Sequence, residues 1–528
     1  MKSIMSVLSI IALGFGLLGC PSNGGGGGGD STTAFAVSTT AADFGVVENP
    51  YTSTLTATGG TAPFTWMQFG GVLPTGLVLD PGTGVVSGIP TAVENPTAVF
   101  TVTDSTGQTA TGSVLFAIHP RTDRVSVDSN GTAGNGASSA SSISGDGSLV
   151  AFVSVSANFV TSVSGTQIYV HNRQTNQIEL ISRDSNATTV IKGDGVSGTP
   201  AISADGRFVA FVSQSTNLVA GVSGQQVYLR DRQTGQTTLV SKSSSGVTSN
   251  GGVNSSPAIS SDGRYIAFVS VATNLGVAGG NQQIYLHDRV TGVTSLISKD
   301  NNAPPVPGDG ASVTPAISAT GQYIAFASVA TNLGAAGGNQ QIYLHDRLTG
   351  VTGTTSLISK DSVATAGNGN SSTPSVSGDG RYVALTSLAT NLLASVSGQQ
   401  IYLHDRNTGA NGTNSLISHD NNGTPVQGNG ASSLPSISSG GQVISFVSLA
   451  TNLLNPAPAV AGQQVYSYDR LTGTTSLVSK DNSVIPVAGN FASDQPSTNS
   501  DGGFVAFSSQ ATNLVAGSGS HIYVRALP

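Results

Sequence analysis

Side chains able to perform chemistry are scarce in this sequence. Only 9% of the 528 residues are charged, and the chain has seven histidines and a single cysteine. Its three glutamates are Glu48, Glu94 and Glu179. A glycosidase needs two carboxylates facing one bond, and a serine hydrolase needs a Gly-x-Ser-x-Gly turn with a paired histidine and acid. No such pattern, phosphate loop or Cys/His cluster is present, so the sequence predicts a non-enzymatic protein without a metal or cofactor.

Most histidines and aspartates recur at one repeated position, which is typical of residues that serve a fold. The aspartate follows an alternating apolar run and is expected to cap the next turn; its copies are Asp231, Asp288, Asp346, Asp405 and Asp469, with Asn172 replacing it once. The residue before it is His171, His287, His345 or His404, and elsewhere Arg230 or Tyr468. Histidines on separate modules cannot converge on one metal ion.

These residues belong to a unit of about 57 to 61 residues that fills the chain after residue 120. Copies of its Asp-Gly turn or a degenerate form begin at Asp146, Asp205, Asp262, Thr320, Asp379, Gly440 and Asp501. The copy that starts at Pro257 has four alternating runs, which predict strands at 258–260, 265–269, 284–288 and 295–298. Seven four-stranded units predict an all-β, seven-bladed propeller over residues 121–528.

The ends of this region predict how the ring closes. The last unit stops after His521-Ile522-Tyr523-Val524 without a fourth strand, whereas 124–128 (RVSVD), before the first unit, reads like that missing strand. The N-terminal strand should therefore complete the last blade, which removes an open sheet edge.

The repeated pattern resembles the WD-like propeller repeats of the TolB type: Pro-x-x-Ser-x-Asp-Gly-x-x-Ile-Ala-Phe, then Ile-Tyr-x-x-Asp-x-x-Thr-Gly and a Leu-rich strand. It is clearest in 200–241, 257–300, 315–361 and 374–420, and drifts at Gly440 and Thr498. The resemblance implies a bacterial envelope propeller of the binding or scaffolding kind. It does not imply the role of TolB, because no α/β domain precedes the propeller.

Two long connections of each unit emerge at one end of the blade, where binding usually occurs. Six polar residues lie six positions before the first strand's proline or its equivalent, and they are the candidate ligand-binding ring at the axial mouth: Asn135, Asp194, Asp309, Asn368, Asn429 and Asn490. The alternative interpretation is that Asn-Gly and Asp-Gly simply form turns. A second recurring set should fix the start of the other long loop through its side-chain amides: Asn158, Asn217, Asn274, Asn332, Asn391, Asn452 and Asn513.

The N-terminus resembles a bacterial lipoprotein signal. Lys2 is followed by a short apolar run, and Leu17-Leu18-Gly19 precedes Cys20, the only cysteine. The run is too short to span a membrane. We expect residues 1–19 to be a signal peptide, Cys20 to be lipidated, and residues 20–33 to form a Gly-rich tether. By resemblance to the sorting signals of some bacteria, the presence of Pro21 rather than an aspartate after Cys20 implies the outer membrane, on its periplasmic or surface side.

Residues 34–120 resemble the immunoglobulin-like domain common in bacterial surface proteins. Short alternating strands lie between Gly/Pro turns such as 59–63 (GGTAP) and 80–84 (DPGTG), which fits a small β-sandwich. Trp66, the only tryptophan, is expected to plug the core rather than to stack on a sugar. Asp80 and Asp104 are expected to serve turns rather than to bind calcium.

Together these patterns predict a monomeric, lipid-anchored binding or scaffold protein of the bacterial cell envelope. Its polar loop end would bind a protein or a glycan. The formal net charge of −7 and the absence of a basic stripe argue against nucleic acid. The alternative is an envelope polysaccharide hydrolase or lyase that uses non-repeating groups such as Lys192, Asp494 and Arg525; a purely structural spacer is a third.

Overall fold

The computed structural model describes residues 34–527, except 187–188, 252, 277–279, 336–337, 455–461 and 484. Cys20, the signal peptide at 1–19 and the tether at 20–33 lie outside the described residues. All regular elements of the described chain are β-strands. Within those same ranges, no helix is long and apolar enough to cross a membrane.

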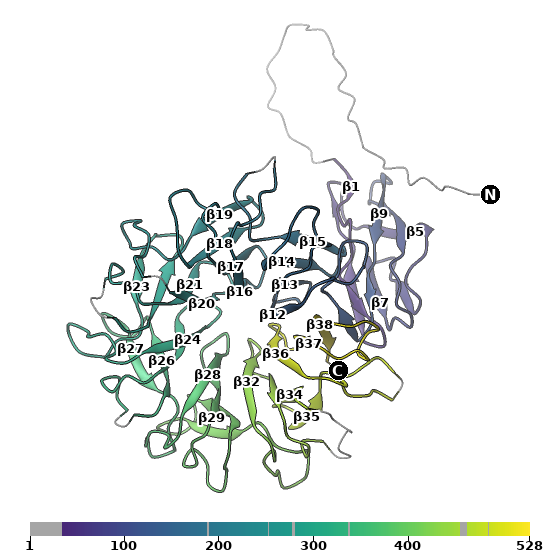
Figure 1. Ribbon diagram of the computed structural model, residues 1–528. Helices are drawn as coiled ribbons and strands as arrows, with labels where there is room; N and C mark the ends of the chain where they lie inside the picture. The colour runs from purple at the N-terminus through teal and green to yellow at the C-terminus, as the bar shows by residue number, and fades with distance from the viewer. Residues whose placement is uncertain are drawn as a thin grey trace.

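The larger part of the described chain forms seven four-stranded antiparallel sheets arranged as blades around one axis (Figure 1). The innermost strands of blades 1 to 7 are β12 (Ser138–Ile143), β16 (Ser197–Ile202), β20 (Asn254–Ile259), β24 (Ser312–Ile317), β28 (Ser371–Val376), β32 (Ser432–Ile437) and β36 (Ser493–Thr498). The second strands are β13 (Leu149–Ser154), β17 (Phe208–Ser213), β21 (Tyr265–Ser270), β25 (Tyr323–Ser328), β29 (Tyr382–Ser387), β33 (Val443–Ser448) and β37 (Phe504–Ser509).

The two outer strands of each blade complete the sheets. The third strands are β14 (Gln167–Asn172), β18 (Gln226–Asp231), β22 (Gln283–Asp288), β26 (Gln341–Asp346), β30 (Gln400–Asp405), β34 (Gln464–Asp469) and β38 (His521–Ala526). The outermost strands of blades 1 to 6 are β15 (Gln177–Leu180), β19 (Gln236–Leu239), β23 (Thr294–Leu296), β27 (Thr354–Leu357), β31 (Thr413–Leu416) and β35 (Thr474–Leu477).

The predicted closure by the N-terminal segment is confirmed. Blade 7 takes its outermost strand, β11 (Thr122–Arg124), from the start of the propeller region, and β11 pairs antiparallel with β38. The strand lies slightly earlier than the predicted 124–128, because in this repeat the Leu-Ile-Ser segment leaves the sheet as it begins the next loop. For the same reason β23 ends at Leu296 rather than at the predicted 298. The first strand of that blade, β20, is longer than predicted, because it begins at Asn254 rather than at 258.

The hydrophobic core lies between blades rather than within one sheet. Ala267 and Ile284 of blade 3 pack in one cluster with Ile324 and Phe326 of blade 4. A middle strand of a blade is therefore covered on both faces, which explains why the second strands read as nearly continuous apolar runs. The outermost strands alternate between buried and exposed residues because one edge of the blade faces solvent.

A ring of backbone hydrogen bonds joins the inner ends of all seven blades. The N–H of Gly145 donates to the carbonyl of Ala204 at 2.8 Å, and the same bond passes from each blade to the next until Ser500 donates back to Gly145 at 3.2 Å. The residues are Gly145, Ala204, Ser261, Ala319, Gly378, Ser439 and Ser500. They lie beside the Asp-Gly turns, so we call this end of the propeller the short-turn face and the opposite end the loop face.

The smaller domain is an immunoglobulin-like sandwich. One sheet contains β3 (Tyr51–Thr54), β7 (Val85–Gly88) and β6 (Leu77–Leu79), and the other contains β5 (Thr65–Gly71), β8 (Thr97–Thr103) and β9 (Thr109–Leu115). Two short pairs complete it: β1 (Ala36–Val37) with β4 (Ala57–Thr58), and β2 (Gly45–Val46) with β10 (Ile118–His119). Trp66 is buried in its core, as predicted. Asp80 and Asp104 accept backbone N–H groups within their turns.

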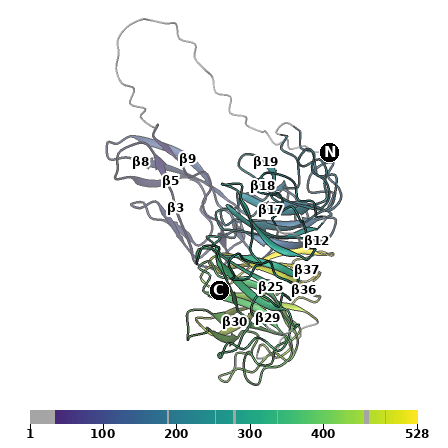
Figure 2. The same cartoon turned by 90° about the vertical axis from the view of Figure 1, so that its left-hand side faces the viewer.

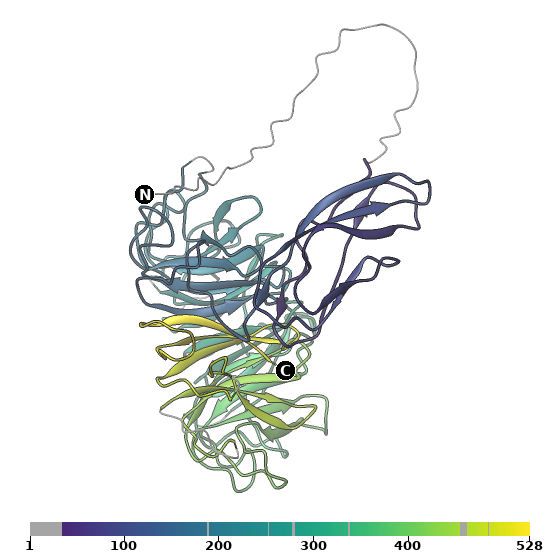
Figure 3. The same ribbon diagram turned by 90° about the vertical axis from the view of Figure 1, so that its right-hand side faces the viewer.

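The sandwich contacts the short-turn face of blades 1 and 7, and Figures 2 and 3 show it projecting from that side of the propeller. The Arg173 guanidinium of blade 1 contacts both the Phe44 ring of the sandwich and the Phe504 ring of blade 7, 4.6 and 4.9 Å from their centres. The His119 imidazole donates to the carbonyl oxygen of Arg173 at 2.7 Å. The two domains therefore meet through a stacked cation and a hydrogen bond.

Each turn glycine on the short-turn face packs against the first side chain of the second strand in the preceding blade. At Gly380, whose φ is +74°, an added Cβ would lie 2.0 Å from the Tyr323 ring. Two independent features thus require glycine here: the left-handed backbone conformation and the close approach of the ring.

We expect Gly380→Ala to destabilise the propeller by about 2–4 kcal/mol, because overpacking adds to the cost of a left-handed alanine. Gly398→Ala is the matched control, since Gly398 has φ of +71° with open space around its Cβ position; it should cost about 1 kcal/mol. Urea denaturation followed by circular dichroism measures both. Equal losses would show that packing against Tyr323 contributes nothing.

Candidate functional site

The predicted polar ring lies on the loop face, in the connections that lead into the innermost strands. Each residue clamps its loop to the loop after the second strand of its own blade. In blade 5, Asn368 accepts the Thr390 N–H at 2.8 Å and donates to the Thr390 hydroxyl at 2.9 Å. In blade 2, Asp194 accepts both the N–H and the hydroxyl of Thr216 at 2.7 Å; the hydroxyl of Thr216 holds the pKa of Asp194 below its usual value.

The recurring asparagines after the second strands complete these clamps. Asn391 donates to the Ala366 carbonyl at 3.0 Å and accepts the Asn368 N–H at 2.9 Å. All seven make the same two bonds, which confirms that they fix the loop. The turn-forming interpretation of the polar ring therefore accounts for its hydrogen bonds, and ligand binding by these residues stays a prediction.

Sequence reasoning missed the member of this ring in blade 3. Asn250 accepts the Thr273 N–H at 2.9 Å and donates to the Thr273 hydroxyl at 2.9 Å, as Asn368 does in blade 5. It lies seven rather than six positions before Pro257, because its loop has one additional residue. The signal that would have found it is the Asn250-Gly251 pair.

A second set of unpredicted residues anchors the same loops from below. The buried glutamine that begins each third strand in blades 1 to 6 accepts a serine hydroxyl from the Leu-Ile-Ser segment and donates to a carbonyl of the blade-to-blade loop. In blade 5, Ser418 donates to Gln400 at 2.6 Å, and Gln400 donates to the Gly428 carbonyl at 2.9 Å. Among the described residues of the loop face, the connections are thus held by the clamps above and the glutamines below.

Apolar side chains project from the loop face beside the axis. The residue directly after the second strand is Val155, Val329, Leu388 or Leu449 in four blades, with 39–52% of its surface exposed. In blade 2 that position is Gln214, and the apolar residue is instead Val196, whose side chain is 55% exposed. Val196 lies beside Gln214, because its carbonyl accepts the Gln214 N–H. Val253 extends the set in blade 3 and is 42% exposed. We call these six residues the apolar ring.

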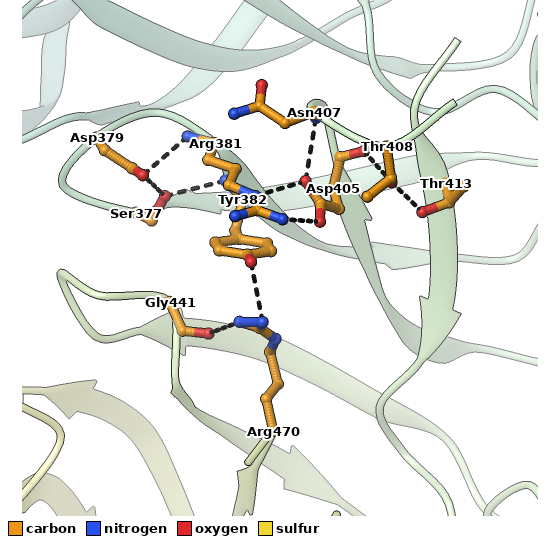
Figure 4. A network of polar contacts seen from close by, with 10 residues as sticks. All are labelled: Ser377, Asp379, Arg381, Tyr382, Asp405, Asn407, Thr408, Thr413, Gly441 and Arg470. Atoms are coloured by element: carbon orange, nitrogen blue, oxygen red, sulfur yellow. Dashed lines mark hydrogen bonds and ion pairs between the residues drawn. The ribbon is translucent and has the colours of Figure 1, made fainter. Parts of the chain in front are cut away.

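The short-turn face instead carries a repeated set of paired charges. Arg381 donates to both oxygens of Asp405 at 2.8–2.9 Å, and Arg470 donates to the Tyr382 hydroxyl at 3.0 Å (Figure 4). Arg207–Asp231 and Arg264–Asp288 repeat the carboxylate pair. The recurring aspartates also accept N–H groups of the following turn, as predicted for a capping residue.

The axis is narrow where the seven backbone bonds close it. A cavity of about 130 Å³ lies there, lined by Ile143, Ile202, Ile259, Ile317, Val376, Ile437 and Thr498, with the small residues of the backbone ring at its rim. Side chains of this kind offer neither acid nor base.

The recurring histidines are buried within separate blades. His287 bonds the Thr294 hydroxyl at 2.9 Å and His345 bonds the Thr355 hydroxyl at 3.0 Å. Burial lowers the pKa of each of these histidines to about 4. Over the described residues, no three His, Cys, Asp or Glu side chains are grouped so that they could hold a metal ion.

The non-repeating groups of the enzymatic alternative are distributed over different elements. Arg525 is buried in blade 7 and donates to the Thr122 hydroxyl and the Asp481 carbonyl. Asp494 lies on the innermost strand of blade 7, where it accepts the Gln495 N–H. Lys192 lies in the loop between blades 1 and 2. Arg525 thus serves the closure of the ring.

Comparisons with known proteins concern the two domains separately. A family model described as "Putative Ig domain" matches residues 31–119. Among solved structures, a protein described as a putative TolB from Agrobacterium tumefaciens is 17% identical, with a TM-score of 0.36 over 69% of this chain and 98% of that chain. The β-propeller domain of the Trilobed protease from Pyrococcus furiosus is 12% identical, with a TM-score of 0.44 over 75% of this chain and 94% of that chain.

The periplasmic gluconolactonase of Pseudomonas aeruginosa is 11% identical, with a TM-score of 0.34 over 74% of this chain and 99% of that chain. The search of curated proteins found no match. The assignment of the propeller therefore depends on the strand pairing of this chain.

The buried histidines predict how stability depends on pH. A histidine whose pKa is lowered on folding binds a proton more readily in the unfolded chain, so stability is full above about pH 6.5 and falls as the pH decreases toward 4. We expect the thermal midpoint to fall between pH 7.5 and pH 4.5, and the His287→Gln/His345→Gln variant to show a smaller fall. Calorimetry at both pH values measures this. An identical fall in the variant would contradict it.

Proposed function

We propose that this protein is a lipid-anchored, non-enzymatic binding or scaffold protein of the bacterial cell envelope, and that its loop face binds a polypeptide partner. The observation that carries the proposal is the apolar ring. Exposed valine and leucine side chains cost solubility, and six of them on one face, beside clamped loops, favour an interaction site there. Clamped loops lower the entropy lost on binding, because the surface is already ordered.

The position of the immunoglobulin-like domain supports the assignment of the loop face as the binding surface. It projects from the short-turn side of the propeller (Figures 2 and 3). An anchor at Cys20, upstream of that domain, would leave the loop face directed away from the membrane that holds the lipid. The asparagine and threonine side chains between the apolar residues would then supply the polar contacts of the interface.

The chain itself provides suitable test substitutions. Gln214 and Gln510 occupy the position of Leu388 and Leu449 in other blades, so glutamine is compatible with the fold there. We expect the Leu388→Gln/Leu449→Gln variant to bind solubilised envelope fractions of the producing bacterium at least about tenfold more weakly than the unaltered protein. Surface plasmon resonance with the immobilised mature protein measures this.

The control is Leu348→Gln/Leu471→Gln, which changes two exposed leucines in the short turns of the opposite face. Unchanged binding by the control together with loss in the loop-face variant supports the proposal, and equal binding by both variants refutes it. Treatment of the fraction with a protease should abolish binding. Binding that survives protease and disappears after periodate oxidation would identify a glycan instead.

A further inference from the structure

Neighbouring blades share a repeated contact on the short-turn face. The ring that begins the second strand of one blade lies beneath an arginine from the turn after the third strand of the next blade. Five junctions of the described chain have this contact, with the guanidinium carbon 3.9–4.9 Å from the ring centre: Arg289 over Phe208, Arg347 over Tyr265, Arg406 over Tyr323, Arg470 over Tyr382, and Arg173 over Phe504. In four of the five, the arginine also donates to the turn glycine's carbonyl of its own blade, as Arg470 does to Gly441 at 2.9 Å.

The junction between blades 6 and 7 lacks this arginine and the ring beneath it. Val443 stands where five of the other six junctions have an aromatic ring and the junction between blades 1 and 2 has Leu149. Leu527 stands where all six have the arginine. Gln442 replaces the arginine that pairs with the aspartate in blades 2, 3 and 5. These exchanges leave a pocket of about 290 Å³ between the two blades, lined by Val443, Leu527, Asp469 and Asp501 among others.

The polar groups of this pocket have no cationic partner. Asp469 corresponds to Asp405, which holds a guanidinium through both oxygens. In contrast, the Asp469 carboxylate contacts only Gln442 at 3.4 Å and the Leu471 N–H of its turn at 2.8 Å. Neither Asp469 nor Asp501 forms an ion pair within the described ranges. The absent arginine also leaves the carbonyl of Gly502 without the donor that Gly441 has.

A buried hydroxyl at the same place adds a second, independent observation. Ser467 lies on β34 at the position of Leu403 in blade 5, a residue that packs toward the next blade. It is only 5% exposed, it lines the pocket, and its hydroxyl has no hydrogen-bond partner among the residues with described positions. Its oxygen is not one of the fully buried, unpartnered atoms of the described residues, so it is accessible from the pocket, where a ligand can hydrogen-bond to it.

We infer that this pocket binds the guanidinium group of an arginine side chain from a partner polypeptide. The incoming group would take the place that the chain's own arginine fills at other junctions, with Asp469 as the charged acceptor and the Ser467 hydroxyl and the Gly502 carbonyl as neutral ones. A planar guanidinium suits such a site because its N–H groups point toward several acceptors at once. Two carboxylates and a hydroxyl are too few ligands for a calcium ion.

At another junction a side chain from a different domain already packs against the ring. Between blades 7 and 1, Gly503 replaces the arginine that flanks the ring in blades 2, 3 and 5. Phe44 of the immunoglobulin-like domain packs there against Phe504, with ring centres 5.3 Å apart. A side chain from another domain thus completes one junction, and the pocket offers the adjacent junction to another molecule. It lies on the face opposite the apolar ring, so the inference stands or falls independently of the proposed function.

Peptide titration tests the inference with the mature full-length protein. The probes are acetyl-Gly-Arg-Gly-amide and acetyl-Gly-citrulline-Gly-amide, which differ in charge and hardly in shape. We expect calorimetry at low ionic strength to detect binding of the arginine peptide, with the citrulline peptide at least about tenfold weaker. Equal affinities of the two peptides would overturn the inference. So would the absence of detectable binding by the arginine peptide at about 10 mM, a concentration at which even weak complexes form.

Two substitutions locate the site. Asp469→Asn should lower the affinity for the arginine peptide at least about tenfold. The matched control is Asp346→Asn, because Asp346 also faces a glutamine, Gln322, while its junction is filled by Arg406 over Tyr323; it should change the affinity less than twofold. A loss of the same size in both variants would refute the pocket as the site.

Filling the pocket from within gives an independent readout. Leu527→Arg supplies the missing guanidinium from the chain itself, so the variant should lose peptide binding and melt at a higher temperature. Ser467→Leu, which introduces the residue found at this position in other blades, should also abolish binding without loss of the fold. Undiminished peptide binding by either folded variant would overturn the inference.

Discussion

The propeller depends on seven backbone hydrogen bonds that run around its axis from Gly145 to Ser500 and back. Because each bond joins the N–H of one blade to the carbonyl of the next, a blade cannot tilt or slide without breaking two of them. The bonds use no side chain, so they require only small residues that let the backbones approach. The ring fixes the spacing of the blades at one end, and the apolar clusters between blades fill the space that this spacing leaves.

The two faces of this ring are built by different means. On the loop face, amides, hydroxyls and the carboxylates of Asp194 and Asp309 clamp the long connections, and the apolar ring lies on the same face. On the short-turn face, guanidinium groups stack on aromatic rings and pair with carboxylates, as Arg381, Tyr382 and Asp405 do in Figure 4. The low overall charge of the chain is therefore not spread evenly, since its arginines are concentrated where neighbouring blades meet.

Much of the fold could be predicted from the sequence, because repetition makes weak signals additive. Seven copies of an Asp-Gly turn give the number of blades, and an incomplete last unit gives the closure by β11. The recurring asparagines were assigned correctly because a residue present in every blade serves every blade. Asn250 was missed because one inserted residue shifts its spacing, and the first strands were predicted too short because serine and asparagine hide their alternation.

The candidate sites were less predictable for a physical reason. The apolar ring consists of single residues that lie far apart in the sequence, and only the closed ring brings them to one surface. The pocket between blades 6 and 7 arises from exchanges at Gln442, Val443 and Leu527, each unremarkable by itself. Their joint effect becomes visible when one junction is compared with the others in three dimensions.

The pairing of β11 with β38 has a consequence for how the protein is made. Thr122 and Arg525 are direct partners in that sheet although about four hundred residues separate them. Thr122 leaves the ribosome long before Arg525 is synthesised. The N-terminal strand therefore stays unpaired until the last strand of the propeller has been made. Ring closure is therefore the final event of maturation, and a chain arrested anywhere before its last strand would present two unprotected edges to the cell's quality-control proteases.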